Sequence, residues 1–125
     1  MSLRIKIEQA RDVAMLDCCG RLVRGEALHF LKDAVTRLSG PRVVELDLSE
    51  VEMLDAGGLG MLCFLHKWSR ASGILLKLIN PSRRALEMLT RTKLTSVLHV
   101  SSADDIVEIP CNSDESTENV NRAVA

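Results

Sequence analysis

Strand-like and helix-like segments alternate along most of this chain, and their order limits the fold more than any other feature. Alternating or continuous apolar runs predict strands at 3–8, 13–19, 42–48, 74–79 and 97–100. Apolar residues at helical spacing predict helices at 26–38, at 57–71 and after Ser82. A polar turn at 9–12 joins the first two strands as an antiparallel hairpin, and a helix precedes each later strand.

This order predicts one α/β domain over residues 1–109, built on a mixed sheet of about five strands. Right-handed crossovers would place the helices mainly on one side of the sheet. The run 74–79 is almost continuously apolar, which is typical of a strand covered by neighbours on both sides. In the third helix, Ser82 is the expected N-cap, and the inward stripe is formed by Ala85, Leu86 and Leu89.

The last part of the sequence differs in composition from the rest. Residues 101–105 can cap a brief helix that ends near Glu108. Residues 110–125 are polar and acidic, so we expect a disordered tail there.

Composition and charge exclude several functions. Aromatic residues make up 2% of the chain, so base-stacking platforms for nucleic acid are not expected. Residues 1–100 carry 15 basic and 11 acidic side chains without a Lys/Arg run, which does not indicate binding to nucleic acid or a membrane. No apolar run approaches the roughly 20 residues that cross a bilayer, and the first residues show no n-region followed by an apolar h-region, so we expect neither a membrane span nor secretion.

The four cysteines form neither a metal-binding nor a disulfide pattern. Cys18 and Cys19 are adjacent, so on a strand they point to opposite faces, and no C-x-x-C pair occurs with Cys63 or Cys111. We therefore expect a reduced, cytoplasmic protein with no metal site and no cofactor.

Three glycines fall within four residues at the junction of a predicted strand and helix, in LDAGGLG at 54–60. Their spacing matches neither G-x-x-x-x-G-K-[ST] nor G-x-G-x-x-G, which argues against a nucleotide-phosphate cradle. Asp55 is instead a preferred N-cap for the helix that follows. Glycine in a helix costs up to ~1 kcal/mol relative to alanine, so a docking surface that must stay flat is one reason to keep these glycines.

A helical wheel divides the helix at 57–71 into two faces. The face that can pack on the sheet contains Leu59, Leu62, Cys63 and His66. The other face, with larger side chains, contains Gly57, Met61, Phe64 and Trp68. This second face needs cover, because contiguous Met, Phe and Trp would be unusual on a monomer. Two interpretations stay open: the acidic tail or a second copy in a homodimer covers it, or it binds another protein.

The segment 44–60 resembles the STAS domain, the fold of bacterial anti-sigma-factor antagonists. That family typically reads apolar-x-Asp-x-Ser, about six residues, then D-S-S-G-L-G, and this chain has VELDLS at 44–49 and DAGGLG at 55–60. The sequences Gly20-Arg21-Leu22 and Asn80-Pro81 support the resemblance, which covers residues 4–108 in element order.

The resemblance implies a non-enzymatic protein that acts by binding a partner. Family antagonists bind a kinase-like anti-sigma factor and free the sigma factor, and phosphorylation of the second serine of D-S-S breaks this contact. The two serines correspond to Ala56 and Gly57, so no phosphorylation is expected at the family position, Gly57. The residues expected to bind the partner are Asp55, Ala56, Gly57, Gly58, Leu59, Gly60, Met61, Phe64 and Trp68.

Two kinds of function remain open. The first is partner binding in sigma-factor control of transcription, either as an antagonist that is always competent to bind or as a STAS scaffold with another partner. Val23, where many antagonists carry Asp, is a second departure from the family. The alternative is a STAS module of a transport system that binds a nucleotide or lipid. An enzyme is disfavoured, because His29, His66 and His99 are widely separated and no nucleophile–base pattern accompanies them.

Overall fold

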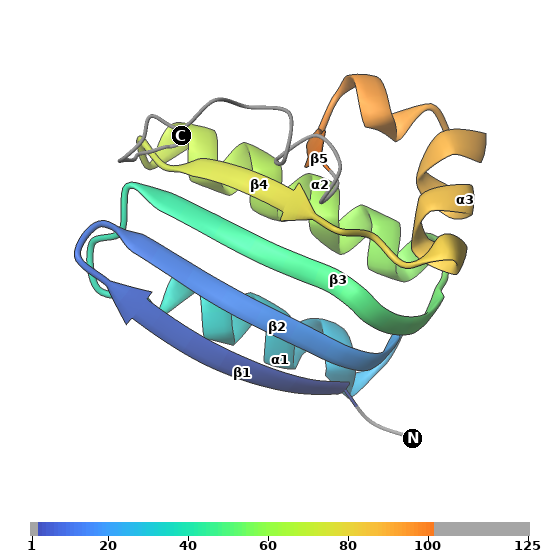
Figure 1. The fold of residues 1–125 in the computed structure, drawn as a ribbon, viewed down its shortest axis with the longest axis horizontal. Helices are drawn as coiled ribbons and strands as arrows, with labels where there is room; N and C mark the ends of the chain where they lie inside the picture. The colour runs from blue at the N-terminus through green and yellow to red at the C-terminus, as the bar shows by residue number, and fades with distance from the viewer. Residues whose placement is uncertain (1–2, 102–125) are drawn as a thin grey trace.

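A β-hairpin opens the part of the chain that the computed structural model describes, residues 3–101, and strand–helix–strand units follow it (Figure 1). The strands are β1 (Leu3–Ala10), β2 (Val13–Leu22), β3 (Val43–Leu54), β4 (Leu75–Ile79) and β5 (His99–Ser101). The helices are α1 (Glu26–Thr36), α2 (Ala56–Ala71) and α3 (Arg83–Arg91), with a 3-10 turn, η1 (Leu94–Ser96), before β5.

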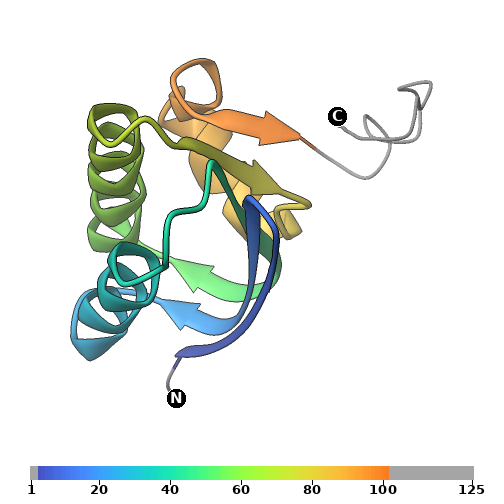
Figure 2. The ribbon, with the colours of Figure 1, turned by 90° about the vertical axis from the view of Figure 1, so that its left-hand side faces the viewer.

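The five strands form one mixed sheet in the order β1-β2-β3-β4-β5. β1 and β2 are antiparallel, and all later pairs are parallel. The predicted hairpin and the predicted five-stranded sheet are therefore confirmed. Helices α1 and α2 lie side by side on one face of this sheet (Figure 2).

The core lies between the sheet and these two helices. Alternate residues of the central strands point into it, as expected for strands with one covered face. The fully buried leucines are Leu16, Leu22, Leu31, Leu46, Leu48, Leu62, Leu65, Leu78 and Leu89. None of the helices within residues 3–101 combines the length and hydropathy that a membrane span requires.

Helix α3 packs against the carboxyl-terminal half of β3. The Ser82 hydroxyl donates a hydrogen bond to the carbonyl of Val51 (2.7 Å) and accepts one from the amide of Ala85 (3.2 Å), which confirms the predicted N-cap. Ala85 and Leu89 are buried, but Leu86 is 43% exposed, so its assignment to the inward stripe was wrong. The helix buries only the narrow side that faces β3.

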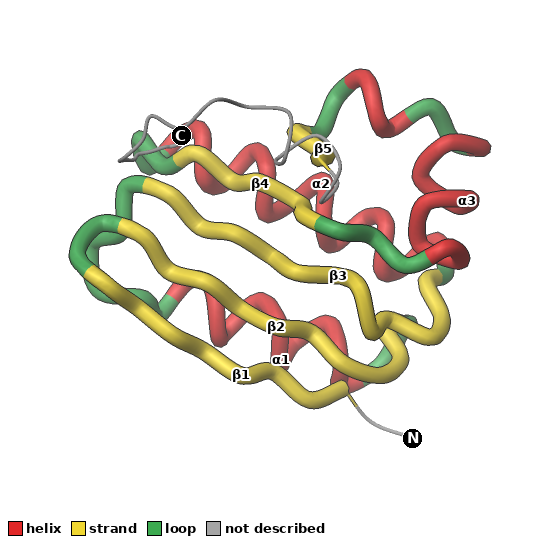
Figure 3. The backbone as a smooth tube through the Cα atoms, viewed as in Figure 1, coloured by secondary structure: helices red, strands yellow, loops and turns green. Residues whose placement is uncertain are grey.

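Strand β3 is longer than predicted and runs directly up to Leu54, through a bend at its carboxyl end (Figure 3). The pairing of β2 with β3 shifts register between Asp17 and Cys19 and again between Gly20 and Arg21. These irregularities break the simple alternation of buried and exposed residues that the sequence prediction relied on. The expected helix near Glu108 and the expected acidic tail at 110–125 lie outside the described residues.

Candidate functional site

Asp55 joins the end of β3, the start of α2 and the loop after β2. One carboxylate oxygen, Oδ1, accepts a hydrogen bond from the amide of Gly58 (2.8 Å), which makes Asp55 the N-cap of α2, as predicted. The other oxygen, Oδ2, accepts one from the amide of Arg24 (3.1 Å). A single carboxylate therefore holds the 23–25 loop against the first turn of α2.

The environment of Asp55 favours its charged form. Partial burial would raise the pKa of the carboxyl, but hydrogen bonds from the amides of Gly58, Arg24 and Gly57, together with the Arg24 charge, outweigh it. The pKa of Asp55 is therefore held below its ordinary value. The start of α2 carries a fixed negative charge, which also suits the positive end of the helix dipole.

The three glycines of this segment have different surroundings. A side chain at Gly58 would overlap the backbone carbonyl oxygen of Leu22 and lie 2.7 Å from Cδ1 of Leu54. A Cβ at Gly57 would lie 3.2 Å from Cβ of Arg24 and 3.3 Å from Cδ1 of Leu28, which is tight. A Cβ at Gly60 would meet nothing within 4 Å. Packing thus explains Gly58, while Gly60 faces open space.

Three residues at a spacing of four form an exposed row along α2: Ala56, Gly60 and Phe64, the last 41% exposed. We call them the α2 row. The Lys32 ammonium of α1 lies 5.1 Å from the centre of the Phe64 ring, a cation–π geometry. The α2 row therefore presents small residues next to the Asp55 cap and an aromatic ring one turn further along.

Helix α1 covers part of the α2 face that the helical wheel left without cover. Leu28 of α1 lies beside Gly57, and Lys32 lies over Phe64. Met61 and Trp68 are half-buried and pack against the hydrophobic core, so they do not form an exposed patch with Phe64. The wheel did not include the neighbouring helix, and that is why this part of the prediction was wrong.

The nine residues predicted to bind a partner therefore differ in accessibility. Ala56, Gly60 and Phe64 are exposed; Asp55, Gly57, Met61 and Trp68 are half-buried; Gly58 and Leu59 are buried. Of the buried and half-buried members, four lie at the helix start, and Met61 and Trp68 pack against the core further along α2. Of the nine, only the three members of the α2 row are exposed.

The sequence interpretation missed the contribution of the 23–25 loop and of α1. Arg24 and Gly25 connect β2 to α1, and Gly25 adopts a φ of 130°, which only glycine reaches without strain. A glycine directly before a predicted helix was the signal for this turn. Nothing in the sequence indicated that the amide of Arg24 in this turn contacts Asp55, which lies 31 residues further along the chain.

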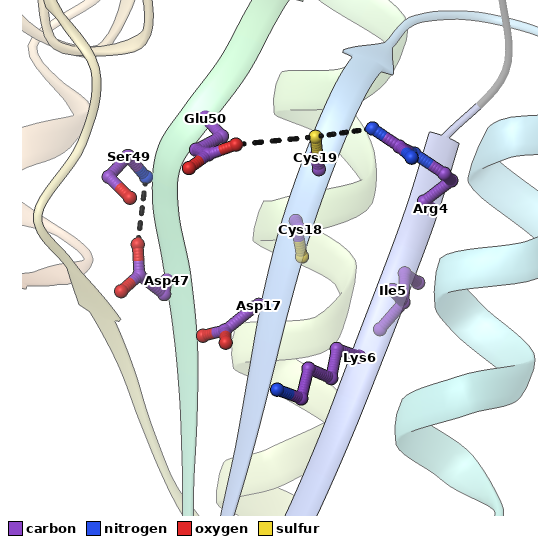
Figure 4. A pocket seen from close by; sticks show the side chains of 9 residues that line it. All are labelled: Arg4, Ile5, Lys6, Asp17, Cys18, Cys19, Asp47, Ser49 and Glu50. Carbon is purple, nitrogen blue, oxygen red and sulfur yellow. Dashed lines mark hydrogen bonds between the residues drawn. The ribbon is translucent and has the colours of Figure 1, made fainter.

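A second feature is a hollow of about 570 Å³ on the sheet face that α1 and α2 leave uncovered (Figure 4). The Arg4 guanidinium lies 3.2 Å from the sulfur of Cys19, whose thiol donates to Glu50 (3.5 Å). Asp17 and Asp47 are register neighbours on β2 and β3. Two cationic and three carboxylate side chains line this hollow, a mixture that selects no single ligand charge.

Within residues 3–101, no three His, Cys, Asp or Glu side chains form a group that could hold a metal ion.

Histidines meet at the opposite end of α2. The rings of His66 on α2 and His99 on β5 have centroids 6.0 Å apart and are tilted by 56°. Burial lowers the pKa of His66, and the nearby His99 ring and Arg70 guanidinium lower it further. His66 is 8% exposed, so it is packed between α2 and the sheet.

Solved structures with this architecture carry the same class of description. A Thermotoga maritima protein described as an anti-sigma factor antagonist is 24% identical, with a TM-score of 0.72 over 83% of this chain and 92% of that one. An anti-sigma factor antagonist from Mycobacterium paratuberculosis is 20% identical, with a TM-score of 0.69 over 84% and 91%. Unphosphorylated SpoIIAA, also an anti-sigma factor antagonist, is 13% identical, with a TM-score of 0.67 over 84% and 94%. No curated protein sequence matches the chain.

A hairpin followed by parallel strand–helix units, with a capped glycine turn opening α2, is the fold that this chain shares with these solved structures. A family model described as "Mlab, STAS domain" matches residues 5–107. The chain belongs to this family, and the resemblance recognised in the sequence is confirmed.

Proposed function

We propose that this protein is a non-enzymatic STAS protein that binds a partner protein in transcription regulation and is not switched by phosphorylation at the start of α2. One observation carries the proposal: Ala56, Gly60 and Phe64 form an exposed row next to the rigid Asp55 cap. Small residues let another backbone approach closely, and the Phe64 ring supplies an apolar anchor. The other residues expected to bind the partner support this surface from behind or from its edge: Asp55, Gly57, Gly58, Leu59, Met61 and Trp68.

The proposed partner is an anti-sigma factor or a related kinase-like regulatory protein. The likeness to solved anti-sigma factor antagonists supports this class. The family phosphoacceptor position is Gly57, which has no hydroxyl and little room, because Arg24 and Leu28 lie against it. The protein would therefore bind its partner constitutively, and its activity would be set by the amounts of the two proteins.

A nucleotide- or lipid-binding role in a transport system has less support. A phosphate-bearing ligand requires a surplus of donors and cations. The hollow on the open sheet face has three carboxylates against Arg4 and Lys6, and the start of α2 already has Asp55 as its acceptor. Calorimetry with ATP, GTP and phospholipid vesicles would give no binding heat under the proposed function.

The proposal is tested by titrating the protein into anti-sigma factors encoded in the same genome, before and after incubation with Mg-ATP. We expect one of them to bind, with the same Kd after incubation and no added phosphate mass on this chain. Dissociation that depends on ATP and on a phosphate carried by this chain would overturn the absence of a switch. Failure to bind any anti-sigma factor would overturn the partner class.

A further inference from the structure

Helix α3 and the η1 turn carry an exposed surface that is strongly basic. Its four exposed cations are Arg83, Arg84, Arg91 and Lys93, and Glu87 is the one acidic residue between positions 83 and 97. We call this the α3 basic surface. Two apolar side chains are exposed with it: Leu86 is 43% exposed and Val97 is 53% exposed. It faces away from β3, against which the other side of α3 packs.

The cations of the α3 basic surface form no ion pair with any other side chain of the described residues. With Glu87 as the one acidic residue among them, these four cations give the α3 basic surface a net positive charge. The first two, Arg83 and Arg84, also lie at the amino end of α3, where the helix dipole disfavours positive charge. An acidic ligand at this end would offset both the net positive charge and its unfavourable position at the helix start.

The sequence supplies such a ligand close by. The backbone carbonyl of Ser101, the last described residue, accepts a hydrogen bond from the amide of Asn80 (2.8 Å), three positions before Arg83. The chain that continues from Ser101 has six acidic residues and one basic residue over 102–125. Asp104 and Asp105 follow Ser101 by three and four residues, which allows a reach of roughly 10–14 Å.

We propose that the acidic residues that follow Ser101, beginning with Asp104 and Asp105, bind the α3 basic surface of the same chain. Charge complementarity favours the contact, and the short connection through Ser101 makes it intramolecular, with a high effective concentration. The pairs are exposed, so salt weakens them. This inference concerns α3 and is independent of the partner surface proposed on α2.

Amide and arginine side-chain NMR spectra of the full chain test this contact. In low salt, Asp104→Asn with Asp105→Asn is expected to shift the Arg83 and Arg84 side-chain Nε–H signals and the amides of residues 84–87. The same substitutions in high salt are expected to leave these signals unchanged. Arg37→Gln, at the exposed C-cap of α1, is the matched control and should not change the spectra of residues 102–108.

A charge exchange separates electrostatic pairing from a local structural effect. Arg83→Glu with Arg84→Glu should abolish the salt-dependent shifts, and adding Asp104→Lys with Asp105→Lys should restore them. Signals that shift only at residues adjacent in sequence to the substituted ones would overturn the proposal. Shifts that grow with protein concentration would assign the contact to a second copy and overturn its intramolecular form.

Discussion

Gly58 lies against the backbone carbonyl of Leu22 so closely that no side chain fits between the start of α2 and the end of β2. Gly60, two residues later, faces open space. The two glycines therefore have different reasons to be present. Gly58 lets α2 approach the sheet, whereas Gly60 is kept at a cost to helix stability.

Alanine substitution is expected to have opposite effects at these two positions. Gly58→Ala should lower the free energy of unfolding by about 1–3 kcal/mol, because the added methyl group overlaps backbone that cannot move away cheaply. Gly60→Ala should raise it by up to about 1 kcal/mol, because alanine favours the helix and meets no atom. Urea unfolding of both variants measures the difference, and equal effects would contradict the assigned roles.

The second prediction concerns the two hydrogen bonds of Asp55. Asp55→Ala removes the N-cap and the acceptor for Arg24, and should lower the free energy of unfolding by about 1–2 kcal/mol. Asp55→Asn retains one acceptor oxygen, so it should keep the N-cap and lose the bond to Arg24. Hydrogen exchange should then become faster at the Arg24 amide in both variants, and at the Gly58 amide only in Asp55→Ala.

Much of the fold could be predicted because its signals are local. The N-caps Asp55 and Ser82 and the existence of a strand near 74–79 each follow from a few neighbouring residues. The predicted cover on both sides of that strand was wrong, because the helices α1 and α2 cover one face of the sheet and Leu75 is 39% exposed. The extension of β3 to Leu54 could not be predicted, because it depends on register shifts in the pairing of β3 with β2. The contact between Lys32 and Phe64 could not be predicted either, because it depends on two helices lying side by side. The predictions that failed are those that required knowledge of a neighbouring element.

Stability should depend on pH through His66. Its pKa is lower in the folded protein than the ordinary value near 6.5, so the unfolded chain binds more protons in acid. The stability that His66 contributes is therefore fully present above the unfolded pKa, about 6.5, and is lost as pH falls below it toward the lower pKa of the folded state. Thermal unfolding across this range should show the loss. His66→Gln should flatten the slope, while His29→Gln, at an exposed position on α1, should preserve it.

The thiols should differ in reactivity. Burial raises the pKa of Cys18 to about 12, and the carboxylates of Asp17 and Asp47 add to this effect. Cys19 points to the open face and is half-exposed, beside Arg4. In the native protein at about pH 8, iodoacetamide should modify Cys18 at least about tenfold more slowly than Cys19. Peptide mass spectrometry measures both rates, which should converge in denaturant; equal native rates would contradict the burial of Cys18.

Partner binding through the α2 row is the central claim, and it requires variants that keep the fold. Gly60→Glu is suitable, because position 60 is exposed and helical and has no neighbour within 4 Å. Ala71→Glu is the matched control, since it adds the same charge at an exposed position at the other end of α2. Circular dichroism should give both variants the helix content and cooperative unfolding of the parent protein.

The most direct measurement is quantitative affinity capture from the native host with the parent protein, Gly60→Glu and Ala71→Glu, compared by mass spectrometry. The proposed function predicts one regulatory protein that is enriched by the parent and by Ala71→Glu and lost with Gly60→Glu. Equal recovery of that protein with all three baits would contradict binding through the α2 row. Enrichment of no protein by the parent would contradict partner binding itself.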